Sequence, residues 1–168
     1  MTSIAVLVGN PHPSSRTTSV AEEIAAQLAE LVGAEVLPTI ELAAYADRVF
    51  VVPDPEIDAL VEEVSTADVV VVASPTYKAA YTGLLKAFLD RVDTGGLDGV
   101  VAVPVLTIGS PAHTLAVEHT LRPLLVELGA TVPVRGLAFP AAEADDRTRL
   151  VSAWLAPHRR ALESLLAH

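Results

Sequence analysis

Four hydroxyl side chains and one arginine gather in residues 14–18, shortly after the first apolar run of the chain, residues 4–8. The amphipathic pattern of residues 15–32 predicts a helix, so this polar cluster lies at a helix N-terminus. Backbone N–H groups and the positive end of the helix dipole bind anions there, and Arg16 adds charge-assisted hydrogen bonds. The pattern favours a phosphate site over the simpler alternative, in which Ser14 or Ser15 only caps the helix.

The same segment lacks the two common nucleotide-binding fingerprints. The GxGxxG pattern of a dinucleotide-binding first turn is missing, and so is the phosphate-binding pattern GxxxxGK[ST]. What remains is a phosphate cradle rich in Ser and Thr, as in flavodoxin-like proteins.

A second candidate binding edge follows the apolar run of residues 69–73. This run of β-branched residues and Ala is typical of a strand buried on both faces of a parallel sheet. We expect the strand to stop at Ser74-Pro75, because proline cannot donate to a strand ladder. The loop after it carries a hydroxyl, an aromatic ring and an amine, from Thr76, Tyr77 and Lys78. Open α/β sheets bind ligands at such strand ends, although an ordinary connection to the helix predicted over residues 81–92 is the alternative.

A third loop at the same edge follows the strand predicted over residues 100–106. It contains Gly109, Ser110 and His113, and a helix is predicted over residues 112–128. Taken alone, His113 favours helix capping or exposure to solvent over a functional role.

Pro123 lies inside this predicted helix. It removes one backbone hydrogen bond and crowds the carbonyl of His119, four residues earlier. We expect a one-residue π-bulge, with a wide turn between Val117 and Pro123; a simple proline kink is the alternative. The helix also carries more apolar side chains than one sheet face covers, which favours a homo-oligomer with this helix in the interface. These side chains are Leu115, Val117, Leu121, Leu124, Leu125 and Leu128.

Strands and helices alternate along the whole chain, which is typical of a doubly wound α/β fold with helices on both faces of a parallel sheet. Five strands are predicted, over residues 4–8, 34–38, 69–73, 100–106 and 132–139. Asp54 and Pro55 predict the start of another helix, and the last helix is predicted over residues 144–167. We expect one domain over residues 1–168 with strand order 2-1-3-4-5, and a ligand at the switch point between strands one and three.

The composition and net charge limit the kinds of molecule that this protein can bind. The chain has 168 residues, 51% of them hydrophobic, a mean hydropathy of +0.46 and a formal net charge of −10. Nucleic acid and anionic membranes are poor partners for such a surface, and no apolar run reaches membrane-spanning length. The absence of Cys excludes disulfides, thiolate metal sites and cysteine nucleophiles. With no signal peptide recognisable at the N-terminus, we expect a cytoplasmic protein.

The segment SPTYKAAYTGLLKAFLD, residues 74–90, resembles the flavin-ring loop and following helix of the NAD(P)H-dependent FMN reductases, which have a flavodoxin-like fold. It is most similar to the branch that supplies reduced FMN to two-component monooxygenases, such as the alkanesulfonate monooxygenases. The resemblance implies FMN and NADPH or NADH as cofactors, with hydride transfer from nicotinamide to flavin N5. The flavin carries that chemistry, so no protein side chain is expected to be catalytic and no metal site is expected.

The resemblance also assigns candidate binding residues. The family shows GSPR followed by SRS or a similar triplet; here Asn10 and His12 replace Ser and Arg, whereas Ser15, Arg16 and Thr17 match. The candidates for the phosphate loop are Asn10, His12, Ser15, Arg16, Thr17 and Thr18. The candidates for the flavin ring are Pro75, Thr76, Tyr77 and Lys78 on one loop and Gly109, Ser110 and His113 on the other. In the similar branch, the helix with Pro123 carries an inserted aromatic or His residue tied to assembly and flavin handling, at the position of His119. The resemblance therefore implies a homodimer or homotetramer and a possible partner monooxygenase.

Two other functions stay open at this point. One is a reductase that retains FMN and reduces quinones, azo dyes or metal ions. The other is a flavodoxin-like electron carrier without enzymatic activity, against which the aromatic content of 4% counts mildly. A phosphoacceptor domain would need an Asp at the end of the third strand, where this chain has Ser74-Pro75.

Overall fold

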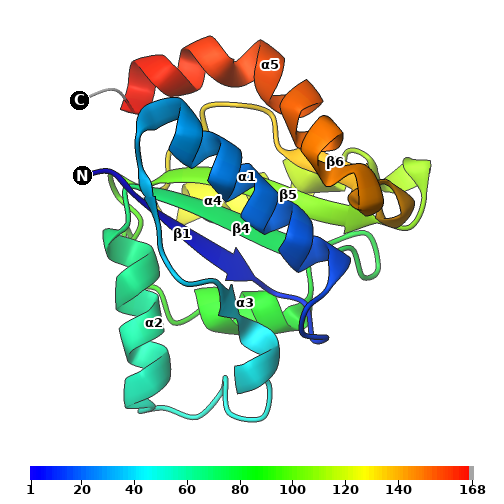
Figure 1. The fold of residues 1–168 in the computed structure, drawn as a ribbon. Helices are drawn as coiled ribbons and strands as arrows, with labels where there is room; N and C mark the ends of the chain where they lie inside the picture. The colour runs from blue at the N-terminus through cyan, green and yellow to red at the C-terminus, as the bar shows by residue number, and fades with distance from the viewer. Residues whose placement is uncertain (167–168) are drawn as a thin grey trace.

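Six parallel strands form one sheet in the computed structural model, which describes residues 1–166 (Figure 1). The strands are β1 (Ser3–Val8), β2 (Glu35–Val36), β3 (Ile40–Glu41), β4 (Val69–Pro75), β5 (Val101–Ile108) and β6 (Leu137–Pro140). Their order is β2-β1-β4-β5-β6, and β3 also pairs with β1. The parallel α/β architecture is as predicted.

The predicted five-stranded sheet of order 2-1-3-4-5 is wrong in its strand count. The segment expected as one strand over residues 34–38 is divided into β2 and β3, which pair with opposite ends of β1. The Leu37 amide still donates to the Ile4 carbonyl at 2.9 Å, but Pro38 has no N–H to continue the ladder. The proline therefore interrupts the pairing, and the chain rejoins β1 at Ile40.

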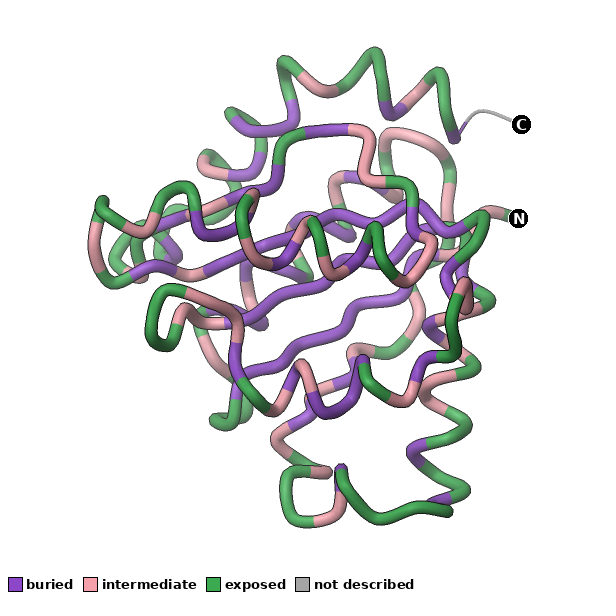
Figure 2. Tube along the Cα trace, turned by 180° about the vertical axis from the view of Figure 1, so that it is seen from behind, coloured by how far each residue is buried: buried purple, intermediate pink, exposed green. Residues whose placement is uncertain are grey.

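Helices cover both faces of the sheet (Figure 1). α1 (Arg16–Val32) and α5 (Arg147–Leu166) lie on one face, and α2 (Pro55–Thr66), α3 (Gly83–Leu89) and α4 (Arg122–Glu127) lie on the other. Val69 and Val71 of β4 pack toward the first group, whereas Val70 and Val72 pack toward the second. The central strands are thus buried along their length, as Figure 2 shows and as their uninterrupted apolar runs predicted.

Helix boundaries differ modestly from the prediction. Ser15 and Asp54 cap α1 and α2 with their side chains, and Pro55 is the first residue of α2. The helix predicted over residues 81–92 is only α3, because Thr82 caps it and a series of turns follows from Asp90. The last predicted helix begins later, since residues 141–146 form a 3-10 helix, and its predicted end at residue 167 lies outside the described residues. No helix within residues 1–166 is long and apolar enough to cross a membrane.

The helix predicted over residues 112–128 contains the expected wide turn. A 3-10 turn (Pro111–His113) precedes a π-helix (Val117–Leu121), and α4 follows. The Arg122 amide donates to the Val117 carbonyl, five residues earlier, which defines the wider turn. Pro123 has no N–H with which to bond the His119 carbonyl, four residues earlier. A regular α-helix would lack that hydrogen bond in any case, which favours the wider turn just before the proline.

The apolar face of this segment is more buried than expected. Val117, Leu121 and Leu125 are buried in the core, and Leu124 and Leu128 are half-buried against it. Only Leu115 among the six side chains named from the sequence is largely exposed. The expectation that one sheet face could not cover these residues is therefore wrong for most of them.

Strand β6 is shorter than the strand predicted over residues 132–139. Arg122 donates to the carbonyls of Val132 and Val134 at 2.7 and 2.5 Å, and Glu118 accepts the Gly136 amide at 2.7 Å. Pro133 has no amide to offer. Side chains from the π-helical region thus satisfy backbone groups that a longer strand would have paired with β5.

Candidate functional site

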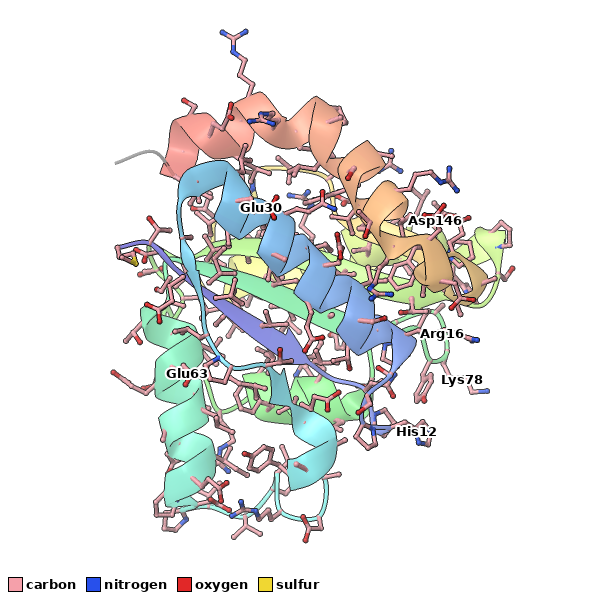
Figure 3. All side chains as sticks on the ribbon, viewed as in Figure 1. His12, Arg16, Glu30, Glu63, Lys78 and Asp146 are labelled. Carbon is pink, nitrogen blue, oxygen red and sulfur yellow. The ribbon has the colours of Figure 1, made fainter. Side chains whose placement is uncertain are left out.

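Three loops meet at the carboxyl edge of the sheet, after β1, β4 and β5. The parallel register places Val8 beside Ala73 and Pro75 beside Thr107, so these strand ends are neighbours. Two backbone bonds join the loops: Gly9 N–H to the Ala73 carbonyl at 2.8 Å, and Thr76 N–H to the Thr107 carbonyl at 2.9 Å. The candidate residues from the first two loops therefore occupy one region, and Figure 3 shows His12, Arg16 and Lys78 at the same edge of the molecule.

Asn10 shapes the turn of the first loop. Its side chain is buried; Oδ1 accepts the His12 amide at 2.9 Å, and Nδ2 donates to Thr17 Oγ1 at 3.3 Å. The first contact is an Asx-type turn, which explains why a short amide side chain suits this position. The buried Asn10 side chain thus stabilises the loop through hydrogen bonds, whereas the His12 side chain is exposed.

The start of α1 offers free donors. Ser15 Oγ accepts the Thr18 amide at 3.1 Å, so the capping alternative is realised. Within residues 1–166, the amides of Arg16 and Thr17 have no protein acceptor. The exposed Arg16 guanidinium stands beside them, at the positive end of a 17-residue helix. The cap therefore leaves the two backbone amides and the Arg16 guanidinium available to bind an anion.

Thr107 is a residue that the sequence did not single out. Its hydroxyl lies 2.8 Å from that of Thr17, which joins the end of β5 to the first turn of α1. The only sequence signal was a hydroxyl at the end of a buried strand. The contact spans 90 positions, so spacing along the chain could not reveal it.

The second loop is a tight and strained turn. Tyr77 and Ala80 exchange backbone hydrogen bonds of 2.8 and 3.2 Å around Lys78 and Ala79. These two central residues have φ angles of 52° and 66°, in the left-handed region that costs non-glycine residues about 1–2 kcal/mol each. Strain of this kind concentrates at binding sites, where surrounding structure holds it in place. The adjacent Thr76 Oγ1 is buried and has no partner within residues 1–166.

Buried Thr82 fastens this loop to the first. Its hydroxyl donates to the Gly9 carbonyl at 2.5 Å and accepts the Leu85 amide at 3.1 Å, while its own amide donates to Ser74 Oγ at 3.0 Å. Gly9 must lack a side chain, because a Cβ would lie 2.5 Å from Leu85 Cβ. Thr82 was not predicted, although a Thr directly before an apolar helix is a capping signal.

The third loop lies just beyond β5. Ser110 Oγ accepts the Ala112 amide at 3.3 Å and starts the 3-10 turn that includes His113. Gly109 is exposed, and Ser110 and His113 are half-buried. These residues follow β5 at the same edge of the sheet as the other two loops, and within residues 1–166 their side chains make no hydrogen bond to either loop. No group of three or more His, Asp or Glu side chains that could hold a metal ion occurs in the described part of the chain.

Counted with β2 and β3 as one strand, the order β2-β1-β4-β5-β6 is that of a flavodoxin-like α/β protein, and the polar loops lie at the carboxyl ends of its adjoining strands. Solved structures agree with this class. The apo form of an NADH:FMN oxidoreductase, EmoB, has a TM-score of 0.83 and 31% identity, covering 98% of this chain and 91% of that one. An oxidoreductase from Corynebacterium diphtheriae has a TM-score of 0.81 and 29% identity, covering 99% and 97%.

The chain belongs to the NADPH-dependent FMN reductase family, which matches residues 2–144. The FMN reductase (NADPH) of Escherichia coli K12 is 32% identical over 173 residues, which cover 94% of this chain and 91% of that relative. The NADH-dependent FMN reductase SfnE of Pseudomonas putida is 36% identical over 154 residues, covering 86% and 80%. These findings confirm the resemblance predicted from residues 74–90 and make the chain an oxidoreductase of a flavin- and nicotinamide-using family.

Proposed function

We propose that this protein is an NAD(P)H:FMN oxidoreductase. The observation that carries the proposal is the junction of a cationic, donor-rich helix N-terminus with a strained loop at the adjoining ends of β1 and β4. When bound, FMN supplies the centre at N5 that accepts hydride from the nicotinamide. The chain has to bind and orient both molecules, which agrees with a site that offers donors and backbone groups.

The residues at the site fit FMN. Free amides at Arg16 and Thr17 and the Arg16 guanidinium suit a phosphate dianion, which accepts several charge-assisted bonds. The full phosphate loop in this proposal comprises Asn10, His12, Ser15, Arg16, Thr17 and Thr18. Pro75, Thr76, Tyr77 and Lys78 line one side of the ring, mostly through backbone groups, and Gly109, Ser110 and His113 flank it from the third loop.

The proposal is compatible with either NADH or NADPH as the hydride donor. Relatives carry the names FMN reductase (NADPH) and NADH-dependent FMN reductase, so the family includes both preferences by name. We also propose that FMN is an exchangeable substrate and that its reduced form passes to a partner monooxygenase. The exposed positions of His12 and Arg16 support this, because a phosphate held at the surface can leave without opening the core. We also propose that the protein assembles as a homodimer or homotetramer and is cytoplasmic.

The decisive experiment follows oxidation of NADH and NADPH with and without added FMN. We expect oxidation that depends on FMN and continues for many turnovers, with little flavin retained after gel filtration. Tightly retained FMN with turnover of quinones or azo dyes would instead support the alternative reductase. A flavin-loaded protein that neither nicotinamide reduces would be an electron carrier and would overturn the enzymatic proposal.

A further inference from the structure

Glu41 reaches from the end of β3 into the first loop. Its Oε1 accepts the Ser14 amide at 2.9 Å and the Thr18 hydroxyl at 2.6 Å. Thr18 is buried in the first turn of α1, and Glu41 pairs with Val8 through the β3–β1 ladder. One carboxylate oxygen thus ties a sheet strand to both ends of the Ser14–Thr18 cluster.

The carboxylate also fixes the direction of two hydroxyl groups. An ionised carboxylate only accepts, so the Thr18 hydroxyl must donate to Glu41. Thr18 Oγ1 lies 3.0 Å from Ser15 Oγ, and in that contact the Ser15 hydroxyl is left as the donor. Ser15 Oγ in turn accepts the Thr18 amide. The Ser15 and Thr18 side chains are therefore occupied with each other and with Glu41.

The bond to Ser14 holds a strained backbone. Ser14 has a φ of 50°, in the left-handed region, which is unfavourable for a residue with a Cβ. A charged acceptor on its amide offsets this cost, because hydrogen bonds to charged groups are stronger than those between neutral groups. Without that acceptor, Ser14 would relax toward an extended conformation and the loop entering α1 would change its path.

We propose that Glu41 is a positioning residue for the phosphate of FMN, an inference that rests on the proposed function. Glu41 holds Ser14 and Thr18 so that the amides of Arg16 and Thr17 stay free and face the anion. Its carboxylate is stabilised by two neutral donors, the Ser14 amide and the Thr18 hydroxyl. The phosphate then binds through backbone amides and Arg16, and the Ser15 hydroxyl supports the loop.

The test compares Glu41→Ala, Glu41→Gln and the control Glu22→Ala by titrating FMN and riboflavin in separate fluorescence experiments. Glu22 and Glu41 line one surface hollow together with Ser14, but Glu22 accepts from Thr39, outside the loop. We expect Glu41→Ala to raise the Kd for FMN about 10-fold, because the loop released from Glu41 would misplace phosphate contacts on the order of one hydrogen bond in strength. The Kd for riboflavin, which has no phosphate, should change less than about 2-fold by the same reasoning.

Glu41→Gln should recover much of the FMN affinity, since its amide oxygen accepts the same two bonds. Glu22→Ala should match the wild type for both flavins. A merely structural role for Glu41 would lower the affinity for both flavins equally, together with the melting temperature, and would overturn the inference. Tighter FMN binding in both Glu41 variants would also overturn it, because Glu41 would then act by repelling the phosphate.

Hydrogen exchange of the flavin-free proteins gives an independent readout. The Ser14 amide should exchange faster in Glu41→Ala than in Glu22→Ala, whereas an unchanged rate would contradict the bracing role. Failure of the proposed function would look different, because wild-type protein would then not reduce added FMN at all. Wild-type reduction of FMN with an unaltered FMN-to-riboflavin preference in Glu41→Ala would refute the inference about Glu41 alone.

Discussion

The Thr82 hydroxyl donates to the Gly9 carbonyl at 2.5 Å, across 73 positions of the sequence. The same oxygen accepts the Leu85 amide and so caps α3. One side chain thereby locks the loop after β1 to the helix that follows the β4 loop. The relative placement of the proposed phosphate and ring edges depends on this contact.

Replacement of Thr82 by Val removes both bonds and keeps the shape of the side chain. The Gly9 carbonyl and the Leu85 amide would then lose a buried partner. We expect the free energy of unfolding to fall by about 2–4 kcal/mol, from a lost cap and an unsatisfied buried group. Urea denaturation measures this loss. Thr82→Ser keeps the hydroxyl and should recover most of it, and equal losses in both variants would contradict the hydrogen-bonding role.

Arg16→Ala tests the phosphate site directly. Removing the guanidinium should weaken FMN binding by about 1.5–3 kcal/mol, the range for a hydrogen bond to a charged group. Riboflavin should be far less sensitive, because it lacks the phosphate. Binding titrations with both flavins give the comparison. Equal losses for the two would remove Arg16 from the phosphate site.

Thr76→Val tests the flavin-ring edge, because it should stabilise the flavin-free protein and weaken the binding of flavin. Thr76 Oγ1 is buried without a partner, and an unsatisfied buried polar atom costs about 1–3 kcal/mol. Valine should therefore raise the free energy of unfolding of the flavin-free protein. If the hydroxyl gains its partner from the ring, FMN and riboflavin should both bind more weakly and by the same factor. Unchanged affinity for both flavins would show that the Thr76 hydroxyl does not bind the ring.

The central strands and the three loops after them were predictable because each depends on local pattern. Apolar runs such as residues 69–73 indicate burial on both faces, and a parallel sheet brings the following loops to one edge. Glu41 and Thr107 were not predictable, since their partners lie 23 and 90 positions away in the sequence. The short β6 was missed for the same reason, because Arg122 takes carbonyls that a strand pattern assigns to the ladder.

Glu118 should contribute stability that acid removes. Burial would raise its pKa, but the hydrogen bonds from Arg122 and from the Gly136 amide prevail and hold the pKa of Glu118 below its usual value. The unfolded chain then binds the proton more readily than the native state, so the contribution is complete above the unfolded pKa. It is lost as the pH falls through the lower folded value.

The measurement compares wild type with Glu118→Gln across acid pH. The difference in the free energy of unfolding should be largest near neutrality and should shrink below about pH 4, close to the unfolded pKa of glutamate. Chemical denaturation at several pH values follows this difference. A constant difference from pH 7 to the acid limit would contradict an ionised Glu118 as the stabilising species.

Deleting His119 should convert the π-helix into a regular helix. The turn is wide because the Arg122 amide reaches back five residues to Val117, so removing one residue restores the four-residue spacing. Glu118 and Arg122 would then stand three positions apart, and their bonds to Gly136, Val132 and Val134 would weaken. We expect altered assembly and a changed rate of flavin release, measured by light scattering and stopped-flow fluorescence.

His119→Ala is the matched control, because it removes the imidazole and keeps the number of residues in the turn. It should retain the π-helix and the wild-type assembly, which separates the effect of backbone length from that of the ring. Leu115, before the π-helix, and Val126, in α4, are 51% and 54% accessible and would supply apolar contacts to the proposed interface. A wild-type monomer in solution would exclude the interface, since both variants would then have no assembly to alter. If the deletion left the oligomer unchanged, the interface would lie elsewhere. The wide turn would then act inside the subunit, where its side chains hold the backbone of residues 132–136.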